Sequence, residues 1–242
     1  MTTDAEPASE QDVTAAPGMP SDAPGTQSSD VGAPPVLQAE PAAARTLFGD
    51  RIDVARSFTN ELARRGEELG LIGPLELARL WTRHILNSVL LAPLLTAGGH
   101  VGDVGSGAGL PGLVLAIARP DVTFTLIEPM ERRVEWLRAE AARLGLETVS
   151  VLRARAEDVA DDLVLDQVTA RAVSALSKLI PMLVPLVRSG GELILMKGAR
   201  VDDEMVAARK VILRKRLENV EVLELGVGVV EETTRVFRAT VD

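Results

Sequence analysis

The feature that most constrains the fold of this chain is the segment 100–112, HVGDVGSGAGLPG, in which a short apolar run ends in closely spaced glycines. Residues 101–104 predict a strand, and a helical pattern starts at about Leu110. A strand, a glycine turn and a helix together form the nucleotide-binding turn of an α/β sheet. Glycine permits positive φ and lets a ligand approach without a Cβ in the way. The helix N-terminus adds unpaired N–H groups at the strand ends.

Two ligand classes compete for this turn. The order Asp103, Gly105-x-Gly107-x-Gly109 is typical of proteins that bind S-adenosylmethionine. The order Gly107-x-Gly109-x-x-Gly112 instead matches the dinucleotide fingerprint. A tight turn without a ligand is the third interpretation, so the rest of the chain has to decide.

The amino-acid composition excludes several kinds of site and structure. The 242 residues are 46% hydrophobic, which is enough for one α/β domain with a buried core. The chain has no Cys and two His, so it can form neither a disulfide nor a cysteine nucleophile, and we expect no metal site. No apolar run reaches the ~18–20 residues of a membrane span. The N-terminus lacks the basic region of a signal peptide, so we expect a cytoplasmic protein with no membrane partner.

Charge is distributed unevenly along the chain. Residues 1–44 hold seven acids and no Lys or Arg, whereas the remaining residues hold 28 acids against 26 bases. Residues 1–44 are also rich in Ala and Pro and poor in large apolar side chains, which predicts a disordered acidic tail. We expect an N-terminal helical cap at 45–97, with helices at 46–66 and 75–95, and an α/β domain at 98–242. Nothing in the sequence indicates an oligomer, so we expect a monomer.

The alternation of strands and helices predicts the fold class. Five strands are expected in alternation with helices, followed by two strands that form a closing antiparallel pair; they are 101–104, 122–127, 149–152, 166–170, 192–196, 220–225 and 233–240. This order predicts the α/β, Rossmann-like fold of S-adenosylmethionine-dependent methyltransferases, with a seven-stranded mixed sheet. A dehydrogenase would need a second half or a substrate domain, and only residues 198–242 remain for one.

Several side chains are expected at the carboxyl ends of these strands. Glu128 follows the second strand, where an acid can accept both ribose hydroxyls of an adenosine. Ala156 and Glu157 or Asp158 follow the third strand, where adenine contacts are made, although Asp158 also suits a helix N-cap. Arg171 ends the fourth strand and therefore lies in the ligand crevice.

The residues after the fourth strand bear on the acceptor of the methyl group. Exocyclic-amine methyltransferases commonly have Asn/Asp-Pro-Pro-Tyr/Phe there, whereas residues 170–173 read ARAV. Pyrimidine C5 enzymes use Cys, which is absent. N7 of guanine already carries its lone pair and needs no base, so it suits a site with cations and no obvious base.

Four segments together resemble the RsmG (GidB) family of bacterial small-subunit ribosomal RNA guanine-N7 methyltransferases. They are RHILNS at 83–88, residues 103–112 with their Leu-Pro-Gly, Arg171-Ala172 and Lys197-Gly198. The resemblance covers roughly residues 47–240. It departs from the family pattern at Asn87, where the family usually has Asp, and at 71–73, where Leu-Ile-Gly replaces Asn-Leu-Thr.

The resemblance implies methyl transfer from S-adenosylmethionine to N7 of a specific guanine in 16S rRNA, with the rRNA or the small ribosomal subunit as partner. The implied catalytic residues are Arg83, His84, Arg171 and Lys197. The expected cofactor-binding residues are Asp103, Gly105, Gly107, Gly109, Leu110, Glu128, Ala156, Glu157 and Arg171. From the pattern alone, His84 can also be a hydrogen-bonded packing residue of its helix.

Basic residues are the candidates for RNA contacts, because phosphates supply salt-dependent affinity. They are Arg83, Arg171, Lys197, Arg200 and the cluster Arg209, Lys210, Arg214, Lys215 and Arg216. That cluster can equally be the solvated face of a helix. Trp81 is the only aromatic residue expected near the mouth of the site. Two alternative functions remain at this stage, which are a small-molecule methyltransferase and a non-catalytic S-adenosylmethionine-binding RNA-binding module.

Overall fold

The computed structural model describes residues 36–160, 162–171 and 174–242. Most of the predicted tail at 1–44 therefore lies outside the described residues. The described residues form one compact unit. Residues 38–42 lie against the helices that follow, since Gln38 hydrogen-bonds Thr82 and Glu40 pairs with Arg56. No helix in the described part of the chain is both long and apolar enough to cross a bilayer.

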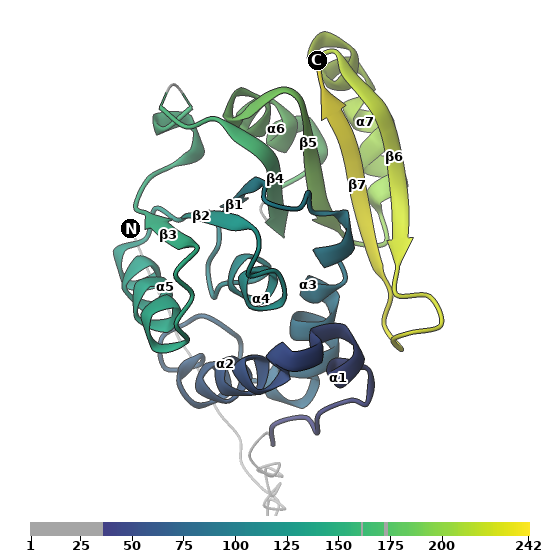
Figure 1. The fold of residues 1–242 in the computed structure, drawn as a ribbon. Coiled ribbons are helices and arrows are strands. Elements are labelled where there is room, and N and C mark those ends of the chain that lie inside the picture. Colours follow the sequence, from purple (N-terminus) through teal and green to yellow (C-terminus); the bar gives the residue numbers. More distant parts are fainter. Residues whose placement is uncertain (1–35, 161, 172–173) are drawn as a thin grey trace, which may run out of the picture. The chain divides into compact units, whose positions relative to one another are not determined.

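A seven-stranded sheet in the order β3-β2-β1-β4-β5-β7-β6 forms the centre of this unit (Figure 1). The strands are β1 His100–Val104, β2 Thr123–Ile127, β3 Val149–Leu152, β4 Leu165–Arg171, β5 Val187–Lys197, β6 Leu217–Leu225 and β7 Thr234–Val241. The first five are parallel, and β7 is antiparallel to both β5 and β6. The predicted Rossmann-like mixed sheet is confirmed.

Helices cover both faces of the sheet. They are α4 Gly112–Ala118 and α5 Glu131–Arg143 on one face and α6 Leu176–Leu183 and α7 Val201–Arg214 on the other. Alternate residues of β5 show the two faces, because Ile194 and Met196 pack with α4 and the N-terminal helices, whereas Leu193 and Leu195 pack with α6 and α7. Both faces of the parallel strands are therefore buried, as expected for this architecture.

The strand β5 begins earlier than the sequence predicts. We expected a strand at 192–196, but β5 begins at Val187, so Gly190 and Gly191 lie within it. The pairing shifts from Leu165 opposite Val187 to Gln167 opposite Glu192, so β5 bulges beside β4. A Cβ on Gly191 would lie 2.5 Å from the carbonyl oxygen of Asp166, so only glycine fits this close approach of two backbones.

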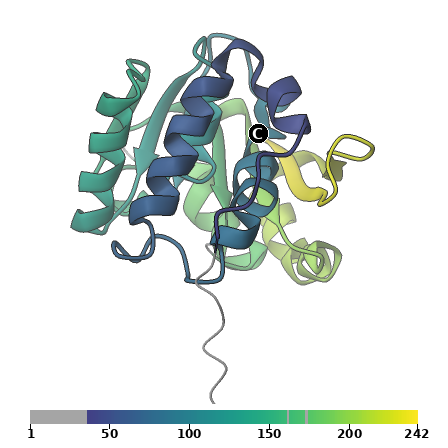
Figure 2. The same cartoon turned by 90° about the horizontal axis from the view of Figure 1, so that it is seen from below.

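The N-terminal cap is helical, but its second helix is broken. Helix α1 (Ala43–Phe48), a short turn at Gly49–Arg51 and α2 (Ile52–Arg65) replace the single helix expected at 46–66. The expected helix at 75–95 consists of η2 (Leu77–Arg79), the π-helix η3 (Leu80–Leu86), α3 (Asn87–Val89) and η4 (Ala92–Leu94). The cap packs against α4, and Figure 2 shows α2 from below.

Side-chain contacts accompany this irregular geometry. The hydroxyl of Ser88 donates to the carbonyl of His84 (2.6 Å), and Arg171 of β4 donates to the carbonyl of Arg83 (3.1 Å). A π-helical turn is uncommon and occurs often at functional sites. Here it carries Arg83 and His84 to the carboxyl end of β4.

Candidate active site

The glycine turn between β1 and α4 has the backbone that its sequence predicts. Gly105, Gly107 and Gly109 all have positive φ. Gly109 has φ +93°, and a Cβ there would lie 2.5 Å from Leu113, so an L side chain would be strained and crowded. The turn therefore presents bare backbone at the carboxyl end of β1.

Three side chains fix this turn. The carboxylate of Glu128 accepts a hydrogen bond from the N–H of Gly107 (2.9 Å). Asp103 accepts one from the N–H of Gly112 (3.1 Å), and the indole of Trp136 donates to the carbonyl of Ala108 (3.1 Å). The sequence indicated the two acids but not Trp136, whose position on α5 gave no sign of this contact.

Glu128 is held at the tip of β2 with its orientation fixed. Its side chain is almost completely buried, and its second oxygen accepts a hydrogen bond from the N–H of Met130 (3.0 Å). Each carboxylate oxygen has two lone pairs, so both can accept a further donor such as a ribose hydroxyl. The position and the remaining acceptor capacity of Glu128 fit the predicted contact with adenosine.

Asp103 is fully buried beneath the turn. Burial raises the pKa of Asp103 to about 7, although the hydrogen bond from Gly112 acts in the opposite direction. Among the described residues, nothing hydrogen-bonds its other oxygen, Oδ1. A buried polar atom without a partner carries a free-energy cost, and a hydrogen bond with a bound ligand or water would remove that cost.

The other predicted cofactor residues differ in exposure. Ala156 is buried next to the carboxyl ends of the strands, in the short helix η5 (Ala156–Asp158). Glu157 is exposed, and Leu110 is half-buried just before α4. All three belong to loops at the edge of the sheet where the glycine turn lies, as a site for an adenosine group requires.

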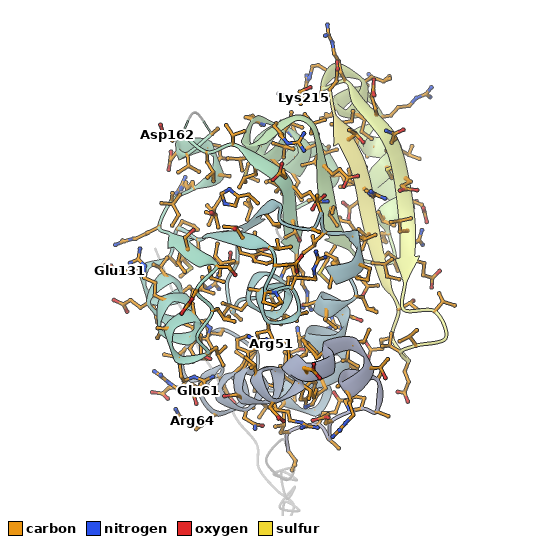
Figure 3. The ribbon with its side chains drawn as sticks, in the orientation of Figure 1. Arg51, Glu61, Arg64, Glu131, Asp162 and Lys215 are labelled. Carbon is orange, nitrogen blue, oxygen red and sulfur yellow. The ribbon has the colours of Figure 1, made fainter. Side chains whose placement is uncertain are left out.

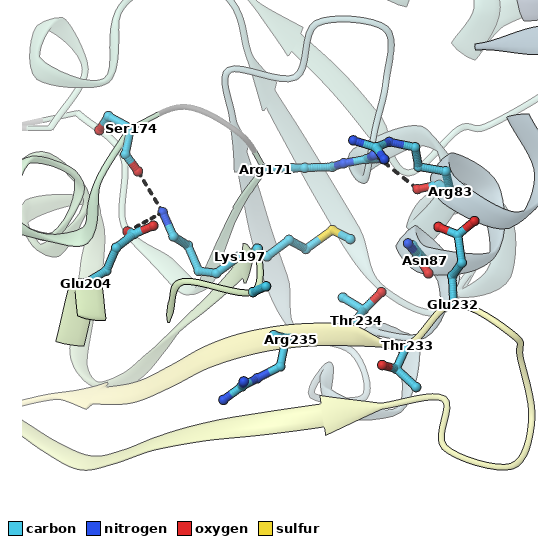
Figure 4. A pocket seen from close by; sticks show the side chains of 13 residues that line it. Arg83, Asn87, Arg171, Ser174, Lys197, Glu204, Glu232, Thr233, Thr234 and Arg235 are labelled. Atoms are coloured by element: carbon cyan, nitrogen blue, oxygen red, sulfur yellow. Dashed lines mark hydrogen bonds and ion pairs between the residues drawn. The ribbon is translucent and has the colours of Figure 1, made fainter. Parts of the chain in front are cut away.

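A pocket of about 660 Å³ opens where β4 and β5 end and β7 begins (Figure 4). It brings together the predicted residues Arg83, Arg171 and Lys197, and Asn87 also lines it. Further lining residues that the sequence did not indicate are Ser174, Glu204, Glu232, Thr233, Thr234 and Arg235. Arg171 ends β4, the immediate neighbour of β1, and the other predicted cofactor-binding residues are not among the residues that line this pocket.

Arg171 is fixed by two acceptors from the π-helix η3. Its Nη2 donates to the carbonyl of Arg83 (3.1 Å) and lies 2.8 Å from Nδ1 of His84. On the other side of the ring, Nε2 of His84 lies 2.5 Å from the carboxylate of Glu76. The predicted catalytic candidate His84 does not line the pocket; it lies behind Arg171.

Lys197 is bound to its own neighbours. Its Nζ donates to the carbonyl of Ser174 (2.8 Å) and pairs with Glu204 (2.7 Å), and its side chain is 8% exposed. The same oxygen of Glu204 accepts the N–H of Leu176, the first residue of α6. Lys197 therefore ties the end of β5 to α6 and α7, and its ammonium group is already engaged.

The basic cluster of 209–216 lies away from the pocket. Helix α7 starts beside the carboxyl end of β5, near Lys197, and β6 begins at Leu217, opposite Val241 at the far end of β7. Because β7 is antiparallel to β5, this is the amino-end edge of the parallel strands. Figure 3 labels Lys215 there, at the top of the view. Trp81 is 3% exposed and belongs to the core, so it offers no aromatic surface at the pocket.

Solved structures share this architecture. A precorrin-6y C5,15-methyltransferase of Geobacter metallireducens has a TM-score of 0.50 at 16% identity, over 71% of this chain and 91% of its own. A SAM-dependent O-methyltransferase of Thermotoga maritima has a TM-score of 0.50 at 18% identity, over 69% and 71%. The sheet order and the glycine turn are those of the Rossmann-like fold that S-adenosylmethionine-dependent methyltransferases share.

Sequence similarity then gives the family. The family model GidB, described as rRNA small subunit methyltransferase G, matches residues 51–232, and the chain belongs to this family. A protein of Clavibacter michiganensis subsp. michiganensis named Ribosomal RNA small subunit methyltransferase G is 66% identical over 86% of this chain and 98% of its own length. One of the same name from Leifsonia xyli subsp. xyli is 63% identical over 85% and 98%. In the described residues no group of three or more His, Asp or Glu is arranged to hold a metal.

The buried carboxyl group of Asp103 predicts a pH-dependent stability. The folded protein holds the proton of Asp103 up to about pH 7, whereas the unfolded chain loses it near about pH 4. Ionisation of Asp103 therefore lowers the free energy of unfolding as pH rises from about 4 to 7. The Asp103→Asn variant keeps an acceptor for Gly112 and cannot ionise. We expect the free energy of unfolding of this variant minus that of the parent protein to rise by roughly 2–4 kcal/mol as the pH increases from about 4 to about 7.

Urea unfolding of both proteins at pH 5 and pH 8, without S-adenosylmethionine, measures this difference. The Asp166→Asn variant is the control, because Asp166 pairs with Arg188 and its pKa is lowered, so it does not titrate in this window. A pH-independent difference between parent and Asp103→Asn would show that Asp103 is ionised in the folded protein throughout.

The orientation of Glu128 predicts an effect on cofactor affinity. In Glu128→Gln one of the two backbone N–H groups, of Gly107 or Met130, would face an amide NH₂ instead of an oxygen. We expect the Kd for S-adenosylmethionine to rise roughly 10- to 100-fold, as for the loss of a hydrogen bond to a charged group. Glu131→Gln is the matched control, since Glu131 is exposed and pairs with Arg153. Isothermal titration calorimetry gives both Kd values, and equal values would contradict a role of Glu128 in the site.

Proposed function

We propose that this protein transfers the methyl group of S-adenosylmethionine to N7 of a guanine in 16S rRNA of the small ribosomal subunit. S-adenosylmethionine supplies an electrophilic methyl group. The residues of the glycine turn fit its adenosine end, because Glu128 is oriented with free acceptor capacity and Oδ1 of Asp103 has no hydrogen-bond partner among the described residues. The names of the relatives support rRNA of the small subunit as the acceptor class.

One observation carries the choice of the acceptor atom, namely that the carboxylates lining the described pocket are already engaged. Glu204 pairs with Lys197, and Glu232 is exposed and accepts a hydrogen bond from Thr82 (3.4 Å). His84 lies behind Arg171 with both ring nitrogens engaged, and Lys197 is held by Ser174 and Glu204. An amine, a hydroxyl or a carbon acceptor would need a base to take its proton. N7 of guanine has an in-plane lone pair and loses no proton, so positioning and exclusion of water suffice.

The arginines at the pocket are suited to guide RNA. Arg83 and Arg171 line the pocket, and Arg200 is exposed at the start of α7 on the same edge of the sheet. Phosphate contacts from such residues position a nucleic acid independently of its sequence. We propose that the protein meets the small subunit in the cytoplasm and acts there as a monomer.

Transfer of labelled methyl groups to small ribosomal subunits from cells that lack this protein tests the function. Borohydride and aniline treatment cleaves RNA at N7-methylguanine. We expect a single strand break that depends on the enzyme and on S-adenosylmethionine. Label without cleavage would reject N7 but keep the methyltransferase. No label on subunits or on free rRNA, with S-adenosylmethionine still bound, would favour a small-molecule acceptor or a non-catalytic binding module.

The two ends of α7 predict different effects on RNA affinity. Arg200 precedes α7 at the pocket edge, and Arg214 ends it at the opposite edge; both are exposed. Arg200→Glu should weaken binding to 16S rRNA and reduce the slope of log K against log salt by about 1, since a phosphate contact is lost. Arg214→Glu makes the same charge change and serves as the control. A larger loss for Arg214→Glu would place the RNA on the basic cluster of 209–216.

A further inference from the structure

Three side chains from separate segments form a hydrogen-bonded row behind the pocket. Glu76 precedes η2, His84 lies in the π-helix η3 and Arg171 ends β4. The carboxylate of Glu76 lies 2.5 Å from Nε2 of His84, and Nδ1 of His84 lies 2.8 Å from Nη2 of Arg171. The row ends at the pocket, which Arg171 lines and the other two do not.

The partners of His84 determine its protonation. Arg171 can only donate, so Nδ1 must accept and carry no proton. Glu76 can only accept when ionised, so Nε2 must carry the proton. A protonated His84 would direct an N–H at the guanidinium and break the row. The contacts therefore require neutral His84 in the Nε2–H tautomer.

The charges around His84 act in the same direction. Burial lowers the pKa of His84, and the charges of Arg171 from β4 and Arg83 from η3 lower it further, against the opposing effect of Glu76. Burial disfavours the charged form of Glu76, but the hydrogen bonds from Arg79 and His84 outweigh it and lower the pKa of Glu76 to about 2. His84 is therefore neutral and Glu76 ionised at physiological pH.

Arg171 keeps one donor group that the described protein atoms do not use. Its Nη2 is occupied by His84 and Arg83, whereas its buried Nη1 has no hydrogen-bond partner among the described residues. Burial lowers the pKa of Arg171 to about 10, which still leaves it charged near neutral pH. A buried charged donor without a partner is costly, so the row holds Arg171 ready for an acceptor atom of a ligand.

We propose that Glu76 and His84 are positioning residues, which hold Arg171 so that its free Nη1 binds an oxygen of the bound reactants. The shared chemistry is an oxygen acceptor, which either the carboxylate of S-adenosylmethionine or the guanine base can provide. Glu76 touches neither reactant and acts only through His84. This inference rests on the proposed function for its kinetic test, but its spectroscopic test does not.

The spectroscopic test is unusually simple, because His84 and His100 are the only histidines in the chain. Long-range ¹H–¹⁵N spectra of the imidazoles report which ring nitrogen carries the proton, and His100→Asn assigns the remaining signals to His84. We expect the Nε2–H tautomer of His84 at pH 7.5 and protonation only below the ordinary His range. In Arg171→Ala we expect His84 to protonate at higher pH. An Nδ1–H tautomer, or a charged ring at pH 7.5, would overturn the proposal.

The kinetic test compares three variants. Glu76→Ala removes the acceptor of His84, and we expect kcat to fall roughly 100-fold, as for a displaced catalytic group. Glu76→Gln keeps an acceptor for Nε2–H and should retain most of the activity. Glu61→Ala is the matched control, because Glu61 also pairs with arginines and has a side chain 17% exposed, against 19% for Glu76, but lies on α2. Control and Glu76→Ala should have similar Tm values.

A double-mutant cycle separates positioning from stability. If Glu76 acts through Arg171, Glu76→Ala should cause no further loss of activity in the Arg171→Ala background. If Glu76→Ala lowers the activity of Arg171→Ala by the same factor as it lowers that of the parent protein, the proposal is refuted. The Kd for S-adenosylmethionine and the KM for the small subunit show which reactant Arg171 contacts. If the parent protein transfers no methyl group, the proposed function fails while the spectra still test the row.

Discussion

The side chains of two buried acidic residues hold the backbone of the glycine turn, on which the site depends. Glu128 fastens the glycine turn to the tip of β2, and Asp103 fastens the start of α4 to β1. A turn of three closely spaced glycines loses much conformational entropy when it is ordered, so it needs such fixed acceptors. Burial of the Asp103 side chain is unfavourable for its charged form and raises its pKa to about 7. A site for a charged ligand is thus prepared with a local loss of stability.

The positive groups at the pocket divide into those held by the protein and those left available. Lys197 is neutralised by Glu204 and joins three elements, so the fold needs it even without a ligand. Arg171 is oriented by neutral acceptors instead, the ring of His84 and the carbonyl of Arg83. The carboxylate of Glu76 does not contact Arg171, because the imidazole ring of His84 lies between them. The full charge of Arg171 is therefore directed toward the pocket. A sequence pattern would not distinguish Arg171 from Lys197 in this respect.

Local pattern was sufficient for the sheet and the glycine turn, because short apolar runs and the order of strand, turn and helix can be read from neighbouring residues. It failed where contacts between distant segments decide the backbone. The helix expected at 75–95 is broken while its carbonyls at 83 and 84 bond to Arg171 and Ser88. β5 begins at Val187, ahead of the strand expected at 192–196, and Gly191 lets it pass close to β4. Glu76 and Trp136 carry no local signal, since their partners are visible only in three dimensions.

The position of β7 has a consequence for the order in which the sheet is completed. This strand lies between β5 and β6 and pairs with both, although it follows every other element in the chain. During synthesis β5 keeps an unpaired edge, and β6 has no neighbour, until β7 has been made. Thr234 and Arg235 of β7 also line the pocket. The pocket is therefore completed only at the end of synthesis, so an incomplete chain carries the glycine turn without the complete pocket.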